Sequence, residues 1–201
     1  MGFLQTLLTP MLLDLTDEST LGAVRSVAAV GMIVASLIIG VFNMKGAHLT
    51  YITCFLAAGG VLIFLLGTTT SILAIGVLAF AFFMTLPPLN TSVEVIARSS
   101  IPNETQGKVW GLMGLISQLG YVVAYAVSGV LADSVFNPLL REGGALADSL
   151  GALIGVGTSR GIGFMLMIVG VLLIGMAVAI PRARSIRSLQ NNLPLTEKKG
   201  V

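Results

Sequence analysis

The few side chains in this sequence that could do chemistry lie mostly in or beside long apolar segments. Gln118, Tyr121 and Tyr125 occupy positions i, i+3 and i+7 of one such segment, and this spacing places them on a single helical face. Polar groups are costly within a membrane and usually face a cavity or a partner helix. We therefore expect this face either to line a substrate path, with the tyrosines as a flat aromatic wall, or to join helices by hydrogen bonds.

A second polar group surrounds two consecutive prolines. Thr85 and Asn90 flank Pro87 and Pro88 in another apolar segment. Proline supplies no backbone donor and clashes with the preceding turn, so the pair should kink or break the helix. Broken membrane helices often line binding sites, which makes Thr85 and Asn90 candidates for the same path. A purely structural kink is the alternative.

Three charged residues near the ends of apolar segments are candidates for coupling or gating. Glu94 and Arg98 are spaced i,i+4, which favours a solvated surface pair over a role in moving protons. Arg25 falls in the first turn of its segment. There an interfacial anchor is favoured over a counter-charge for a substrate.

Nothing in the sequence is typical of an enzyme. The one histidine, His48, lies in a predicted connector and the one cysteine, Cys54, in a predicted helix, so neither a catalytic triad nor metal-ligand spacing occurs. The glycines of "GVGTSRGIG" at 155–163 have a phosphate-loop spacing, but a membrane span follows them and no strand precedes them. We predict no catalytic residues, no cofactor and no metal.

The elements that must position these residues are membrane-spanning helices. Apolar residues make up 55% of the chain and charged residues 10%, against about 25% charged in soluble domains. Five stretches can each cross a hydrocarbon core about 30 Å thick, and none alternates like a barrel strand. We predict an all-α, polytopic transmembrane bundle with spans at about 21–42, 49–66, 72–96, 108–132 and 161–181.

A shorter apolar run, residues 3–13, is about half the length needed to span. We interpret it as the second half of a truncated helix and expect the rest of the bundle to hold it poorly. The bundle is then predicted to cover residues 1–181, with an outer loop at 134–160 and a cytoplasmic tail at 182–201.

The basic residues predict the orientation, because cytoplasmic loops carry an excess of Lys and Arg. If the C-terminus is cytoplasmic, only Arg25, Arg141 and Arg160 of the 11 basic residues lie outside. We predict a multi-pass protein of the inner (plasma) membrane with a cytoplasmic C-terminus. The net charge of +2 is too small to indicate nucleic acid binding.

Small residues recur at spacings that predict close helix packing. One set recurs every fourth residue and another every seventh, so each lies on one helical face: Gly120, Ala124, Ser128 and Ala132, and Gly163, Gly170 and Ala177.

Several motifs carry a family resemblance. The connector "ARSSIPNETQGKVWGL" at 97–112 resembles the loop between helices ten and eleven of the major facilitator superfamily, especially its macrolide-efflux-like drug exporters, with Lys108 in place of arginine. "GVLADSVFNPLL" at 129–140 is similar to that family's end of helix eleven, with Asn137 where an acid is usual. "GVFNMKGAH" at 40–48 is a weaker likeness to the superfamily's loop motif, with the first glycine out of register.

The resemblance implies the C-terminal half, about helices 7–12 with the first truncated, of a 12-helix transporter. Such a half would share proton-coupled export of hydrophobic or amphipathic drugs, such as macrolides, with an N-terminal half. The expected partners are then a small amphipathic substrate, protons, that second half and the lipid bilayer. The alternative is a non-transporting membrane subunit or truncated remnant that serves only as a helix-assembly surface.

Overall fold

Five long apolar helices form the protein in a computed structural model, which describes residues 2–41, 48–140, 143–144, 151, 157 and 160–182. They are α2 (Glu18–Val41), α3 (His48–Thr68), α4 (Ile72–Ser100), α5 (Asn103–Leu131) and α8 (Arg160–Ala179). All five are long and apolar enough to cross a membrane. The prediction of an all-helical bundle compatible with a multi-pass membrane protein is therefore confirmed.

The predicted outer loop begins too early. A π-helical turn η1 (Ala132–Phe136) and a short helix α6 (Asn137–Leu140) continue α5, so residues 134–140 are helical. The backbone N–H of Asn137 bonds the carbonyl of Ala132, five residues back, which lets the helix absorb an extra residue instead of ending. A short 3-10 helix η2 (Ile180–Arg182) follows α8. Most of the remaining loop, the 42–47 connector and the tail from residue 183 lie outside the described residues.

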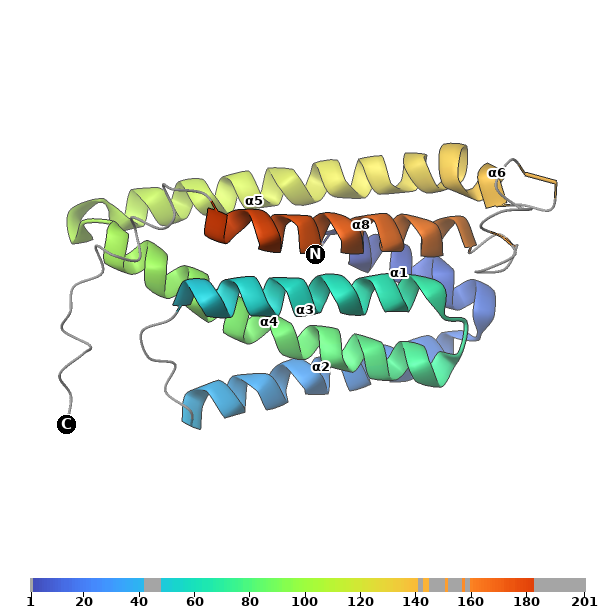
Figure 1. Ribbon diagram of the computed structural model, residues 1–201, viewed down its shortest axis with the longest axis horizontal. Helices are drawn as coiled ribbons and strands as arrows, with labels where there is room; N and C mark the ends of the chain where they lie inside the picture. The colour runs from blue at the N-terminus through green and yellow to red at the C-terminus, as the bar shows by residue number, and fades with distance from the viewer. Residues whose placement is uncertain are drawn as a thin grey trace.

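The short first helix, α1 (Gly2–Leu15), is part of the central core. Leu7, Met11 and Leu12 are at most 2% exposed and pack with α2, α4 and α8 residues in one hydrophobic cluster. The helix begins about half-way along the bundle (Figure 1). The expectation that this segment is poorly held is wrong, because Leu7, Met11 and Leu12 recur at helical spacing and point into the bundle.

Glycines bring α3 and α8 into backbone contact. A methyl group added at Gly170 would lie 2.6 Å from the Gly60 carbonyl oxygen, and one added at Gly163 would lie 2.6 Å from that of Gly67. The two pairs are seven residues apart on each helix, and the helices are antiparallel. Gly163, Gly170 and Ala177 are all buried, so the predicted packing face of this segment is confirmed.

The two prolines do not break α4. The helix is continuous from Ile72 to Ser100, with Pro87 and Pro88 buried inside it. The Ser92 hydroxyl donates to the Pro88 carbonyl at 2.8 Å, and α2 and α3 pack along α4. Packing against neighbouring helices of this kind lets membrane helices tolerate proline.

The helix α5 lies at the edge of the bundle (Figure 1). Its close packing partner among the other described helices is α1, and Ser128 is its one buried residue. Leu115 and Val122 are 58% and 64% exposed. Gly120 has no atom near its missing side chain, so the predicted small-residue face is packed at Ser128 and Ala132 but not at Gly120.

Candidate functional site

The predicted polar face lies on α5, which is largely exposed. Gln118 is exposed and Tyr121 is half-buried. The rings of Tyr121 and Tyr125 stack, with centroids 6.3 Å apart and planes 28° from parallel. The two rings therefore share the helical face that the spacing predicts, and Tyr125 keeps 42% of its surface exposed.

Thr85 lies elsewhere, in a cavity of about 210 Å³ between α3, α4 and α8. Its walls are almost entirely apolar, with Phe55, Phe82 and Leu166 among them. The Thr85 hydroxyl donates to the Phe82 carbonyl at 2.7 Å, so its proton is used within its own helix. Asn90, five residues on, is exposed. No residue of α5 lines this cavity, so the structure does not unite Thr85 with the tyrosines.

Glu94 and Arg98 meet at the surface. The carboxylate and guanidinium are 3.7 Å apart, and their side chains are 52% and 66% exposed. Arg98 also lies over the Trp110 ring, 5.9 Å from its centroid. An ion pair this exposed contributes about 0–1 kcal/mol. The contact of Arg98 with Trp110, and not the ion pair within α4, links the end of α4 to α5.

Gln106 adds a second link between α4 and α5, and the sequence did not predict this role. Its side-chain amide nitrogen lies 3.3 Å from the carbonyl oxygens of Arg98 and Ile101 and 3.1 Å from the Asn103 side-chain oxygen. Carbonyls at the end of a helix lack partners within it. Gln106 supplies one for α4 while standing in the first turns of α5.

Arg25 contacts α1. Its Nη2 donates to the Thr9 hydroxyl at 2.6 Å, and the residue is exposed. This position suits the anchor that the sequence favours, with a protein partner in addition.

His48 is in the first turn of α3 and not in a connector. It is 3% exposed, and neither ring nitrogen has a hydrogen-bond partner in the part of the chain that the structure describes. The Tyr51 ring lies edge-on to it at 6.4 Å. Residues 42–47, directly before it, are not a continuous apolar run, so the sequence predicted that His48 lies in a loop.

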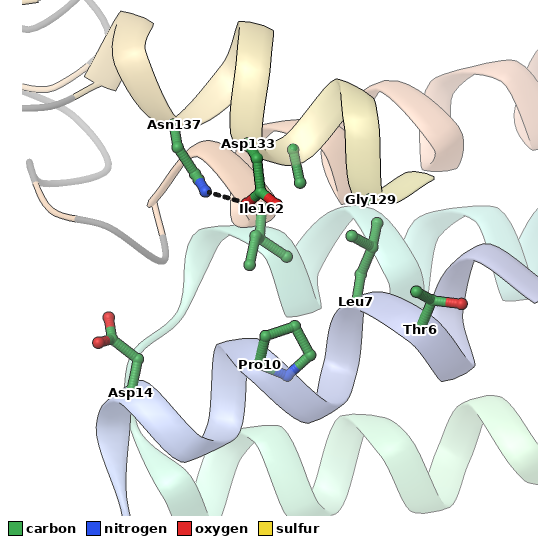
Figure 2. Close-up of a pocket in the computed structure, with 9 residues that line it drawn as sticks. Thr6, Leu7, Pro10, Asp14, Gly129, Asp133, Asn137 and Ile162 are labelled. Atoms are coloured by element: carbon green, nitrogen blue, oxygen red, sulfur yellow. Dashed lines mark hydrogen bonds between the residues drawn. The ribbon is translucent and has the colours of Figure 1, made fainter. Parts of the chain in front are cut away.

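A second cavity, here named the α1–α5 cavity, was not predicted. It measures about 290 Å³ and is lined by residues of α1, the end of α5, η1, α6 and α8, including Asp14, Asp133 and Asn137. Figure 2 shows the Asn137 side chain pointing toward Asp133, with Asp14 on the α1 side. The distance between Asn137 Nδ2 and the Asp133 carboxylate is 3.4 Å.

The i,i+4 spacing of Asp133 and Asn137 could have indicated this cavity, but both residues lie beyond the predicted span at 108–132. Asp14 comes from a segment 119 residues earlier in the chain, and nothing local links it to them. Among the described residues, no group of three His, Cys, Asp or Glu side chains is placed to hold a metal.

No protein-family model, curated protein or solved structure matches this chain significantly.

Proposed function

We propose that the chain forms the C-terminal half of a secondary transporter of the major facilitator superfamily. The half exports hydrophobic or amphipathic compounds, with an inward proton flux as the driving force. The observation that carries the proposal is the pattern in which the six main helices pair.

The main pairings repeat when the first three helices are exchanged for the last three, although α1 contacts α2 and its counterpart α4 has no comparable contact with α5. If α1, α2 and α3 correspond to α4, α5 and α8, then the packing of α1 on α5 corresponds to that of α4 on α2. Likewise α3 on α4 corresponds to α8 on α1, and α3 on α8 corresponds to itself. The helices α1 and α4 run in opposite directions (Figure 1), so the repeat is inverted. Inverted three-helix repeats build each half of this superfamily.

The bare flank of α5 supports the same proposal. Transporters of this type bind substrate near the bilayer midplane between two halves. A second six-helix half placed beside α5 covers its exposed apolar residues and leaves Gln118, Tyr121 and Tyr125 facing the path. On the remaining helices, the surfaces that face lipid and those that face other helices can both be apolar, because lipid tails are as apolar as leucine.

Reconstitution tests the proposal. The chain is placed in liposomes alone and together with a matching N-terminal six-helix half, and movement of a fluorescent amphipathic dye is followed after a pH gradient is imposed. We expect gradient-dependent movement only with both halves. Co-assembly of the halves without dye movement would instead favour the helix-assembly surface, and movement by the single chain would overturn the division into halves.

A further inference from the structure

The cavity between α3, α4 and α8, here named the mid-bundle cavity, lies half-way along all three helices. Its lining residues come from positions 55–63 of α3, 82–89 of α4 and 166–173 of α8, which are the middle turns of each helix. In a hydrocarbon core about 30 Å thick, this level is about 15 Å from either headgroup layer. The surroundings of the bundle at the level of the cavity are therefore hydrocarbon.

The walls of the mid-bundle cavity offer almost nothing to a polar ligand. Thr85 carries the one hydroxyl group among the lining side chains that the structure describes, and this hydroxyl already donates to the Phe82 carbonyl at 2.7 Å. A buried water needs several polar partners, and apolar cavities without them stay dry. A void also costs its walls the dispersion contacts that a filled space would provide. The cavity therefore favours an apolar occupant over water or empty space.

The cavity is closed toward the centre of the bundle and open toward its surface. On the closed side, Ile63 is 3% exposed and Leu166 is fully buried. Phe55, Leu89 and Val169 are only half-buried, so they form the rim. No described residue of α5 lines the cavity. The opening therefore leads to lipid and not to the exposed face of α5.

The size of the cavity fits the end of an acyl chain. An apolar cavity of about 150 Å³ takes up benzene, and this one measures about 210 Å³. A methyl group added at Gly59 would lie 3.4 Å from the Thr85 Oγ1 and 3.5 Å from a Phe82 ring carbon. These are ordinary contacts, so the glycine leaves space unfilled. Chain ends of lipids are the hydrocarbon present at this depth, and an abundant ligand occupies its site by mass action.

We propose that the mid-bundle cavity binds the methyl end of a lipid acyl chain, in contact with Phe55, Phe82 and Leu166. The bound chain fills the space between α4 and the α3–α8 pair, so the lipid is a structural ligand of the bundle. It is not an exported compound, because the site is separate from the path proposed at α5. The inference requires only that the bundle lies in a bilayer, and failure of dye transport by the two halves would leave it unchanged.

Photolabelling tests the site on the full chain in phosphatidylcholine nanodiscs. A small fraction of the lipid carries a diazirine at the methyl end of one acyl chain, and peptide mass spectrometry locates the adducts after irradiation. We expect adducts on Ile63 and Phe82, which are 3% and 5% exposed and closed to bulk lipid, as well as on Val61, which is 46% exposed. The same lipid with its diazirine beside the glycerol should give several-fold fewer adducts on Ile63 and Phe82, because its reactive group lies near the headgroups.

Val169→Phe fills the cavity from its rim, and Val171→Phe is the matched control. Val171 is 55% exposed on the same helix and does not line the cavity. Relative to Val61, labelling of Ile63 and Phe82 should fall several-fold in Val169→Phe and stay unchanged in Val171→Phe. Helical circular dichroism identifies a variant that fails to fold, and in that case the comparison of the two probes on the unaltered chain decides.

Four results would overturn the lipid site. The first is labelling of Val61 without labelling of Ile63 and Phe82, and the second is equal labelling of these two residues by both probes. The third is an unchanged ratio in a folded Val169→Phe variant, and the fourth is an equal fall in Val171→Phe.

Discussion

The guanidinium of Arg25 on α2 and the hydroxyl of Thr9 on α1 are joined by a hydrogen bond of 2.6 Å. This bond fastens the short helix α1 to its neighbour α2. Arg25→Met should lower the free energy of unfolding by about 1 kcal/mol, the usual net contribution of an intramolecular hydrogen bond. Unfolding by SDS in mixed micelles measures the change.

Thr9→Val and the double variant complete the cycle for this pair. If the bond is the source of the effect, the double variant should lose less than the sum of the two single losses, because contacting residues are not additive. Full additivity would show that Arg25 acts through lipid headgroups or water and not through Thr9.

A methyl group at Gly170 should separate α3 from α8. In Gly170→Ala the new carbon would lie 2.6 Å from the Gly60 carbonyl oxygen and 2.8 Å from the Phe64 nitrogen, so the backbones must move apart. Overpacking of this kind costs about 1–3 kcal/mol. The control is Gly175→Ala on the same helix, where nothing lies near the missing side chain. That variant should be neutral or slightly more stable, since alanine favours helix.

The exposed face of α5 is expected to serve transport and not stability. In the reconstituted two-half protein, Gln118→Leu and Tyr125→Ala should each reduce dye export several-fold while membrane insertion stays normal. Glu94→Gln should have a mild effect, because its pair with Arg98 is exposed. Normal export in both α5 variants would assign that face to helix contacts, and loss of export in Glu94→Gln would give this carboxylate a role in proton coupling.

Cysteine labelling tests the orientation. In a Cys54→Ala background, a cysteine at Asn103 should be shielded from an impermeant thiol reagent in intact cells, and cysteines at Thr70 and Ser134 should be labelled. All three residues are exposed, and Cys54 is replaced because it is exposed too. The asymmetry of basic residues is the basis for this expectation. The reverse labelling pattern would invert the topology.

The start of α2 should weaken in acid. Hydrogen bonds from the Thr20 hydroxyl, the Thr20 backbone N–H and the Thr16 hydroxyl lower the pKa of Asp17 from its usual 3.8. Since the pKa is lower in the folded state, the stabilisation is complete above the unfolded value and is lost as the pH falls through the folded one. Amide exchange of Thr20, corrected for its intrinsic pH dependence, should therefore accelerate in that range.

Asp17→Asn is the control for this effect. Asparagine caps helices about as well as aspartate but does not titrate, so the acid-dependent acceleration should disappear. An unchanged acceleration would place the titrating group elsewhere.

The long helices could be predicted because each is a local property of the sequence. A run of about twenty apolar residues dictates a helix in lipid, whatever its neighbours are. The packing face of α8 could also be predicted, because glycine and alanine at regular spacing in a membrane helix indicate close helix packing. The stacking of Tyr121 on Tyr125 followed from their spacing on one helix.

Features that depend on neighbouring helices could not be predicted in the same way. The burial of Leu12 depends on which helices surround α1, and hydropathy does not distinguish a residue facing lipid from one facing protein. The prolines of α4 predicted a kink or a break, because the supporting contacts of α2 and α3 are not visible in the local sequence. Asp14 and Asp133 were assigned to connectors for the same reason, since only the packing of α1 on α5 brings them to one cavity.

The glycine contacts between α3 and α8 determine which parts of the bundle can move. The backbones of α3 and α8 are in contact at two points, so the helices cannot slide past each other without a collision between main-chain atoms. We therefore expect the pair to move as one rigid body. The helix α5 has no such restraint along most of its length. In any rocking motion we therefore expect α5, with its stacked tyrosines, to move relative to the α3–α8 pair.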